Sequence, residues 1–248
     1  MRFEDKVAKL RIEKHSGRET NLFLDDVKKM CEGEAFEYIM GEVNFCGAKI
    51  DLSLRPMIPR PETEFWVGES IKQIKETEAN DLKFLDLFSG SGNVGLAILH
   101  NIKESSVDFV EYDFKLKEQI EISINKNKIN KSRTNIFIGD TFGNVDSKYD
   151  YIFAVPPYIP KEMKDEVMKE LHAEPELSFF DKEDGFFYIK EVLKNIKKFL
   201  KEGGYLYMEF DITQRVKIEE IAKGSGFNEC SFLKDPYGHE CCLVLKNL

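Results

Sequence analysis

From residue 83 onward, apolar segments of strand length alternate with amphipathic segments of helical spacing. The strand-like segments read KFLDL, VDFVEYD, TNIFIGD, YDYIFAV, GYLYMEF, ECSFL and CCLVLKN. Helical patterns such as KEQIEISINKNK and FFYIKEVLKNIKKFLKEG separate most of them. This alternation predicts a mostly parallel sheet with helices on both faces.

The last two strand-like segments are joined only by the short turn KDPYGHE. A parallel crossover needs about a dozen residues or more, so this pair must run antiparallel. A sheet of six parallel strands and one antiparallel strand is the arrangement of S-adenosylmethionine-dependent methyltransferases, by analogy of fold. The sequence therefore predicts an α/β, Rossmann-like, seven-stranded class I methyltransferase domain over residues 59–248.

The chain before this domain divides into two parts. Residues 1–35 mix charged residues with apolar ones, and the break HSGRETN predicts two short helices there. Residues 36–58 contain two β-like runs around Gly47, which predicts a β-hairpin linker. The stretch RPETEFWVGESIKQIKE then reads as a helix with Pro61 near its start. We therefore expect a small N-terminal helical domain and a hairpin ahead of the main domain.

Composition and charge narrow the class of protein. The chain has 248 residues, enough for one α/β domain with a small appendage. No apolar run approaches the roughly 20 residues that cross a membrane, and the N-terminus carries charges where a signal peptide is apolar. Five cysteines without a regular framework fit a reducing compartment, so we expect a cytoplasmic protein without a membrane partner. The net charge of −9 argues against a surface for duplex nucleic acid, which usually needs a basic face.

Cysteine and histidine give no sign of a metal site. The chain has no C-x-x-C motif, and the adjacent Cys241 and Cys242 would point to opposite faces of a strand. His15 and His172 have no identifiable partner in the sequence. We therefore predict no bound metal.

The first chemical signal is the glycine-rich stretch FLDLFSGSGNVGLAIL. A predicted strand ends there at Asp86, and G-x-G-x-x-G follows at Gly90, Gly92 and Gly95, of which the last would let the following helix pack closely on the sheet. A tight strand–helix turn alone would explain the pattern, and nicotinamide and flavin enzymes share it. However, an acid just before the turn would repel a diphosphate bound at the helix N-terminus. Asp86 suits a ligand with an ammonium group, such as the methionine part of S-adenosylmethionine.

Acids also follow the next two predicted strands. Glu111 is the first choice for binding two ribose hydroxyls and Asp113 the alternate. Asp140 is placed to accept a hydrogen bond from the adenine amino group, and Phe142 to cover the ring. Any one of these acids can be a solvated loop residue, but three at successive strand ends beside a glycine turn indicate a cofactor pocket. The predicted cofactor-binding residues are Arg60, Asp86, Phe88, Ser89, Gly90, Gly92, Glu111, Tyr112, Asp113, Asp140, Thr141 and Phe142.

With IPRPETE, DLFSGSG, GDTF and PPYIP in this order, the sequence resembles the HemK/PrmC family from about residue 36 to the C-terminus. Members of that family are glutamine N5-methyltransferases that modify the Gly-Gly-Gln motif of peptide chain release factors. IPRPETE and EDGFFYI are the most discriminating motifs. The resemblance implies S-adenosylmethionine as cofactor, protein methylation as activity and a release factor as partner. The helical domain before the hairpin is shorter here than is typical of the family.

The resemblance also implies a catalytic loop Asn-Pro-Pro-Tyr. In it, the asparagine side chain and the carbonyl of the first proline hold the target amide, and the tyrosine packs against that amide. Pro156, Pro157 and Tyr158 match this loop, whereas Val155 stands at the asparagine position. We assign Val155, Pro156, Pro157 and Tyr158 as the catalytic loop, with one acceptor of an amide N–H missing.

Three interpretations of Val155 stay open. The protein can methylate a glutamine-like amide through the Pro156 carbonyl and some other acceptor. It can methylate a different acceptor, either another protein side chain or a small molecule. It can also bind S-adenosylmethionine without methyl transfer, although the intact set of acids counts against this third interpretation.

Two further residues of the family motifs have open roles. Arg60 either closes over the cofactor or a substrate carboxylate, or pairs with Glu62 or Glu64 at the start of its helix. Glu174 matches a family segment in which the acid is expected to order a loop. The sequence singles out no general base.

Overall fold

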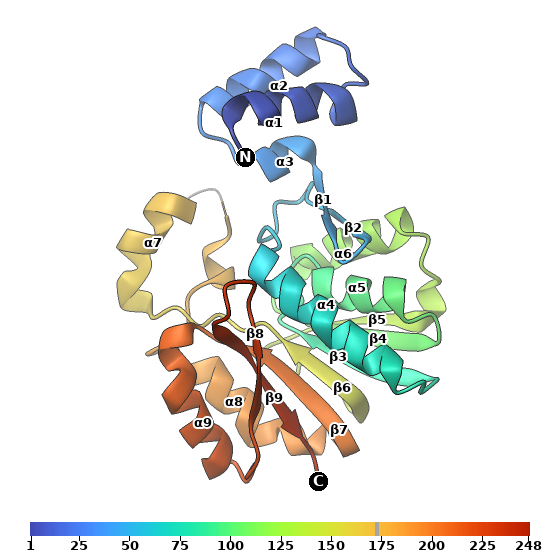
Figure 1. Ribbon diagram of the computed structural model, residues 1–248, viewed down its shortest axis with the longest axis vertical. Coiled ribbons are helices and arrows are strands. Elements are labelled where there is room, and N and C mark those ends of the chain that lie inside the picture. The colour runs from blue at the N-terminus through green and yellow to red at the C-terminus, as the bar shows by residue number, and fades with distance from the viewer. Residues whose placement is uncertain (172–173) are drawn as a thin grey trace.

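The computed structural model describes residues 1–171 and 174–248. His172, for which the sequence suggests no partner, lies outside the described residues. Seven strands form one sheet in the order β5-β4-β3-β6-β7-β9-β8 (Figure 1). The strands are β3 Leu82–Leu87, β4 Ser105–Glu111, β5 Thr134–Ile138, β6 Tyr149–Ala154, β7 Leu200–Glu209, β8 Ser231–Lys234 and β9 Glu240–Lys246. All neighbouring strands pair in parallel except β9, which is antiparallel to both β7 and β8. The predicted sheet of six parallel strands and one reversed strand is confirmed.

Helices cover both faces of the sheet (Figure 1). The longer helices of this domain are α4 Pro61–Glu76, α5 Asn93–Asn101, α6 Phe114–Lys126, α7 Lys164–Leu171, α8 Phe187–Asn195 and α9 Arg215–Gly224. Short 3₁₀ helices span Lys131–Arg133, Lys161–Met163, Glu176–Ser178, Ile196–Lys198 and Ile212–Gln214. Successive strand residues alternate between two cores, because side chains along a strand point to opposite faces. Phe84 joins the core under α4, α5 and α6, and Leu85 joins the core under α8 and α9.

The N-terminal helices form a small core of their own. They are α1 Phe3–Lys9, continued by a π-helix Leu10–Lys14, then α2 Asn21–Cys31 and α3 Phe36–Met40. The buried side chains that pack together in this core are Leu10, Phe23, Phe36 and Ile39. Helix α3 lies where the sequence indicated the start of a linker at residue 36, since Phe36 and Ile39 share one helical face and complete this core.

A cluster of ionisable groups around the buried Asp26 holds the same helices together. Asp26 on α2 accepts a hydrogen bond from Lys14 Nζ at 2.7 Å, and it lies 3.0 Å from His15 Nε2. Lys14 Nζ also donates to the carbonyl of Ile39 on α3. The expectation that His15 has no partner is therefore wrong. The contact could not be found from the sequence because it depends on how two helices pack.

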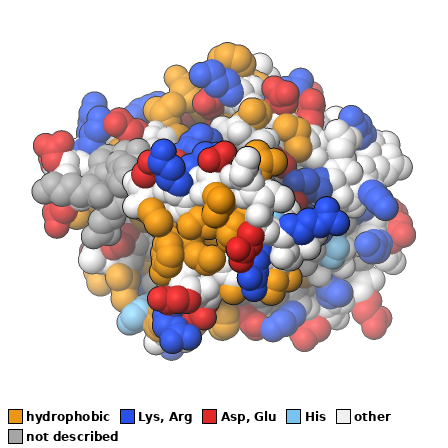
Figure 2. Space-filling view, turned by 90° about the horizontal axis from the view of Figure 1, so that it is seen from above, with side chains coloured by type: hydrophobic (Ala, Val, Ile, Leu, Met, Phe, Trp, Pro, Cys, Tyr) orange, Lys and Arg blue, Asp and Glu red, His pale blue; other side chains and the backbone are white. Residues whose placement is uncertain are grey.

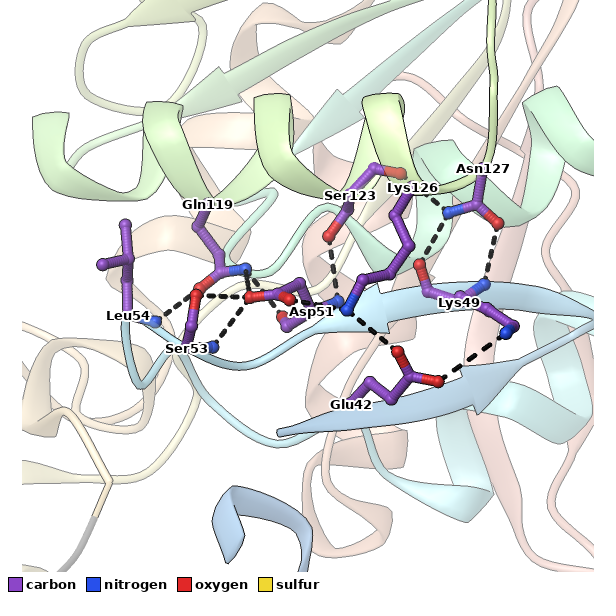
Figure 3. A network of polar contacts seen from close by, with 9 residues as sticks. All are labelled: Glu42, Lys49, Asp51, Ser53, Leu54, Gln119, Ser123, Lys126 and Asn127. Carbon is purple, nitrogen blue, oxygen red and sulfur yellow. Dashed lines mark hydrogen bonds and ion pairs between the residues drawn. The ribbon is translucent and has the colours of Figure 1, made fainter. Parts of the chain in front are cut away.

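The hairpin of β1 Glu42–Phe45 and β2 Ala48–Asp51 connects these helices to the main domain and binds tightly to α6 (Figures 1 and 3). The backbone N–H of Asp51 donates to Ser123 Oγ at 3.0 Å, and Gln119 Nε2 donates to the carbonyl of Asp51 at 2.7 Å. Lys126 Nζ donates to the Asp51 carboxylate at 2.7 Å and to Glu42 at 2.8 Å. This network fixes the hairpin as part of the main domain.

Helix length and hydropathy give no sign of a membrane span. None of the helices in residues 1–171 and 174–248 is both long and apolar enough to cross a membrane.

The end of the molecule that carries the N-terminal helices shows hydrophobic side chains among charged ones (Figure 2). Exposed apolar residues of these helices and of the π-helix between them are Phe3, Ile12, Leu22 and Leu24.

Candidate active site

A cavity of about 520 Å³ opens at the carboxyl ends of β3, β4, β5 and β6. Its size is in the range of sites for small molecules and cofactors. In open α/β sheets, ligands bind at this edge of the strands. The cavity is lined by these sequence-predicted residues: Arg60, Asp86, Phe88, Ser89, Gly90, Glu111, Tyr112, Asp113, Asp140, Thr141, Val155 and Pro157. Gly92, Phe142, Pro156 and Tyr158 do not line it.

Asp86 is the second-last residue of β3, and its buried carboxylate lines the cavity. Its Oδ2 accepts the backbone N–H of Gly95, in the first turn of α5, at 2.9 Å. Burial raises the pKa of Asp86 to about 7, and the neighbouring charge of Glu111 acts in the same direction. A cationic ligand group would stabilise the charged carboxylate in this setting. The site therefore fits the ammonium group of a methionine moiety.

The glycine turn has a role in packing. Gly95 is confirmed as a point of close packing, because a Cβ there would lie 2.3 Å from the Phe109 ring on β4. Gly92 has a φ of +78°, and a Cβ there would meet Ile120 of α6 at 3.0 Å, which explains why it does not line the cavity. Phe88 also has a positive φ, +59°, an uncommon conformation for a non-glycine residue. Such local strain is often found at functional sites.

Glu111 at the end of β4 is the better oriented of the two acids proposed for the ribose. Its Oε2 accepts the N–H of Gly90 at 2.7 Å, and its Oε1 accepts the N–H of Asp113 at 2.8 Å. Burial raises the pKa of Glu111, while these backbone hydrogen bonds act in the opposite direction. Asp113 also lines the cavity, but its carboxylate accepts the N–H of Lys115 and caps α6.

The third acid has a different setting. Asp140 is 44% exposed and forms an ion pair with Lys182 at 2.7 Å. Phe142 stacks on Phe199 with ring centroids 4.2 Å apart and is buried in the core, so its placement does not fit the expectation that it covers a ring in the cavity. Tyr188 of α8 lines the cavity instead and meets Phe88 edge-on at 5.3 Å.

The Pro-Pro-Tyr corner follows β6 directly. Val155 and Pro157 line the cavity, and Pro156 is buried. The carbonyl of Pro156 accepts no hydrogen bond from any residue in the described part of the chain. It is therefore unpaired within the described residues, next to the cavity-lining Val155 and Pro157.

The loop of residues 181–187 packs against the Pro-Pro-Tyr corner. A Cβ on Gly185 would lie 2.6 Å from the carbonyl of Tyr158, so only glycine fits there. The Asp181 carboxylate accepts the N–H of Gly185 at 2.9 Å and that of Phe187 at 3.1 Å. Gln214 Nε2 donates to the carbonyls of Tyr158 and Gly185. The EDGFFYI segment thus holds the corner in shape.

Arg60 pairs with a residue far away in the sequence. Its guanidinium donates to Glu174 at 2.7 Å, and the other oxygen of Glu174 accepts the N–H of Ile58 at 2.8 Å. Glu64 instead accepts the N–H of Cys46 at 2.7 Å. Of the two roles left open for Arg60, the pairing with Glu62 or Glu64 is therefore wrong, because the Glu174 loop reaches over the start of α4. Glu174 does order a loop, as the sequence suggested.

Sequence reasoning missed one polar group beside the corner. Glu209, the last residue of β7, is buried and accepts hydrogen bonds from Thr63 at 2.6 Å and Trp66 at 2.7 Å. Tyr158 donates to its second oxygen at 3.2 Å, so its hydroxyl points away from the cavity into this cluster. The rule that found Asp86 and Glu111, an acid at a strand end, would also have found Glu209. Among the described residues, no three His, Cys, Asp or Glu side chains gather as a metal site.

Comparisons with known proteins agree with this geometry. A sequence profile of the family described as conserved hypothetical protein 95 matches residues 52–198. A protein of Fusobacterium nucleatum called release factor glutamine methyltransferase is 32% identical over 85% of this chain, which spans 59% of that relative's length. Relatives with the same name from Streptococcus pneumoniae and Buchnera aphidicola are 29% and 30% identical, and the chain covers 80% and 73% of them.

Solved structures share the fold. A methyltransferase from Pyrococcus furiosus superimposes with a TM-score of 0.58 at 16% identity, over 81% of this chain and 89% of that one. The T. thermophilus 16S rRNA N2 G1207 methyltransferase, solved with AdoMet and guanosine, gives 0.61 at 14% identity, over 84% of this chain and 50% of that one. The fold, the cavity and the curated relatives together define a class I S-adenosylmethionine-dependent methyltransferase. Within that class, the chain belongs to the HemK/PrmC family of release factor glutamine methyltransferases.

Proposed function

We propose that the protein transfers a methyl group to the side-chain amide nitrogen of a glutamine in a peptide chain release factor, in the cytoplasm. The observation that carries this proposal is the Pro-Pro-Tyr corner, which borders the same cavity as the cofactor acids and leaves the Pro156 carbonyl free. The relatives' names supply the acceptor. The exposed apolar side chains of the N-terminal helices are a suitable surface for a protein partner.

Within the cofactor half, Asp86 would bind the ammonium group and Glu111 the ribose hydroxyls. S-adenosylmethionine supplies an electrophilic methyl carbon, so the chain's task is alignment and stabilisation of charge. Phe88 and Tyr188 would flank the bound molecule, as both line the cavity. Together these residues fix where an acceptor nitrogen has to lie.

In the acceptor half, the Pro156 carbonyl would accept one N–H of the target amide. An amide nitrogen is a weak nucleophile because its lone pair is delocalised, and an acceptor on its N–H favours the charge that develops during attack. Val155 and Pro157 would form an apolar wall that keeps water from the reacting atoms. Tyr158 would shape the corner from outside the cavity, through its contact with Glu209.

Mass spectrometry of a release factor incubated with the protein and S-adenosylmethionine tests the proposal. We expect one added methyl group on the glutamine of the Gly-Gly-Gln motif. A release factor with that glutamine changed to asparagine is the matched control and should take up none. Binding of the cofactor without any methylation of the glutamine would refute the assigned acceptor.

Val155 favours a second candidate, an acceptor that needs one hydrogen bond fewer than an amide. A primary amine is more nucleophilic than an amide and would meet the apolar wall at less cost. Release-factor peptides with lysine in place of the glutamine separate the two candidates. Faster methylation of the lysine peptide would favour the amine.

A further inference from the structure

A buried polar cluster connects the start of α4, the end of β7 and the Pro-Pro-Tyr corner. Its centre is the Glu209 carboxylate, which is 8% exposed. Oε2 of Glu209 accepts from Thr63 Oγ1 at 2.6 Å and from Trp66 Nε1 at 2.7 Å, while Oε1 accepts from Tyr158 at 3.2 Å. Of these partners, only Thr63 also lines the cavity.

The hydrogen of the Thr63 hydroxyl has a fixed direction. The indole N–H of Trp66 can only donate, so Oε2 of Glu209 must be an acceptor. When Glu209 is ionised, Oε2 can only accept, so Thr63 donates to it and the lone pairs of Thr63 Oγ1 are left for another partner. Thr63 lines the cavity, as Val155 and Pro157 do. Because its hydroxyl hydrogen is directed at Glu209, its Oγ1 can accept a hydrogen bond from a group bound there.

We propose that Thr63 is the second hydrogen-bond acceptor for the methyl-accepting N–H group, in place of the side chain that Val155 lacks, with Glu209 as its positioning residue. This inference rests on the proposed transfer to a nitrogen that carries hydrogen. With the Pro156 carbonyl, Thr63 supplies two acceptors for the two N–H groups of a primary amide. The chain thereby retains a pair of acceptors although the amide-binding position is apolar.

The same pair of residues provides a path for the proton that the nitrogen must lose. The nitrogen lone pair forms the new C–N bond as the C–S bond breaks and leaves its electrons on sulfur. The nitrogen then passes a proton to Thr63 Oγ1, while the Thr63 hydroxyl proton moves to Glu209 Oε2. Burial raises the pKa of Glu209, which suits it to take up that proton. No further reactant is needed for this balance.

Three variants test Thr63. Thr63→Val keeps the shape and removes the hydroxyl, and we expect kcat for the release-factor peptide to fall roughly 10- to 100-fold. Binding of the peptide, measured by titration calorimetry without cofactor, should weaken by about 3- to 10-fold, while the Kd for S-adenosylmethionine stays unchanged. Thr63→Ser should restore both values. Ser70→Ala removes a buried hydroxyl of the same helix that donates to the Trp66 carbonyl, and serves as control.

A double-variant cycle separates this role from a structural one. In a Val155→Asn background, a second acceptor is present again, so the loss of peptide affinity caused by Thr63→Val should shrink to about twofold or less. If Thr63 only holds α4 in place, the substitution will cost the same factor in both backgrounds. Equal losses, or no loss in the original background, would overturn the proposal.

Glu209→Gln tests the proton path. Glutamine can accept from Thr63 and Trp66 with its oxygen and donate to Tyr158 with its nitrogen, so the hydrogen bonds persist. We expect an unchanged peptide Kd and a kcat that falls at least about tenfold. An unchanged kcat would remove Glu209 from the path and leave Thr63 as an acceptor alone. Absence of any methylation or binding of the peptide by the unmodified protein would instead refute the proposed function, and the inference with it.

Discussion

The two halves of the cavity differ in how their polar groups are held. In the half proposed for the cofactor, buried carboxylates lie at or next to the carboxyl ends of β3 and β4, and backbone N–H groups fix them. Glu111 accepts the N–H groups of Gly90 and Asp113, and Asp86 accepts that of Gly95. In the half proposed for the acceptor, the wall includes the apolar Val155 and Pro157, and the polar groups that we propose to take part are the Pro156 carbonyl and the Thr63 hydroxyl.

This difference makes the residues of the acceptor half easier to change than those of the cofactor half. The cofactor acids depend on strand register and on a turn that also packs α5 against the sheet, so changes there disturb the fold. A residue at the Val155 position adds one side chain to a loop that Gly185 and Asp181 already hold. Functional groups on such loops can change without loss of the scaffold.

Among the substitutions, Asp86→Ala should have the largest effect on the binding of S-adenosylmethionine. A small effect would contradict the difference between the two halves of the cavity. Asp86→Ala should weaken S-adenosylmethionine binding by at least about 100-fold in titration calorimetry, because a buried charge partner of the ammonium group is lost. Asp150→Asn, at the opposite end of the strands where the carboxylate accepts from Lys83 and Lys201, is the matched control. Similar affinities for the two variants would show that the pocket is assigned wrongly.

Glu111→Gln should have a smaller effect on the same half. A glutamine side chain at this position can accept only one of the two backbone N–H groups well, and it loses the charge that strengthens hydrogen bonds to ribose hydroxyls. We expect the Kd for S-adenosylmethionine to rise roughly 10- to 30-fold. Asp113→Asn should change it by much less, since that carboxylate caps α6. The reverse order would exchange the roles of the two acids.

The sequence predicted the sheet and most of the strand-end residues that line the cavity, because both follow from local rules. Apolar runs of strand length indicated the strands, the short turn KDPYGHE indicated the reversed strand, and acids at strand ends indicated Asp86 and Glu111. The placement of Phe142 was misjudged because strand alternation does not continue into a loop. Thr141 before it has a φ of +51°, so alternation no longer tells which way the next side chain points.

Contacts between distant segments could not be predicted. Arg60 forms a hydrogen bond with Glu174, which lies 114 positions away in the sequence, and Thr63 forms one with Glu209, which lies 146 positions away. A single sequence carries no signal for such pairs, because each depends on how a loop or helix packs on the finished sheet. The resemblance to family motifs pointed to the Pro-Pro-Tyr corner as the predicted catalytic loop. It did not point to the hydrogen bond between Tyr158 of this corner and Glu209.

The pH dependence of cofactor binding sharpens the description of Asp86. Its pKa is raised to about 7, chiefly by burial, so the empty site loses the charge that attracts an ammonium group as pH falls below about 7. Affinity for S-adenosylmethionine should therefore drop by about 5- to 10-fold between roughly pH 8 and pH 6. Calorimetry in buffers of different ionisation enthalpy should also detect proton release on binding near this pKa. A flat profile would mean that Asp86 is charged throughout this range.

Tyr158→Phe should give the smallest effect, confined to the acceptor half. The substitution keeps the ring that packs in the corner and removes only the hydroxyl that donates to Glu209 at 3.2 Å. Because Glu209 keeps Thr63 and Trp66 as donors, we expect kcat for a release-factor peptide to fall about 2- to 5-fold. The Kd for S-adenosylmethionine should not change, since the hydroxyl lies outside the cavity. A change in cofactor affinity larger than the change in kcat would show that the two halves are coupled through Glu209 and are not independent.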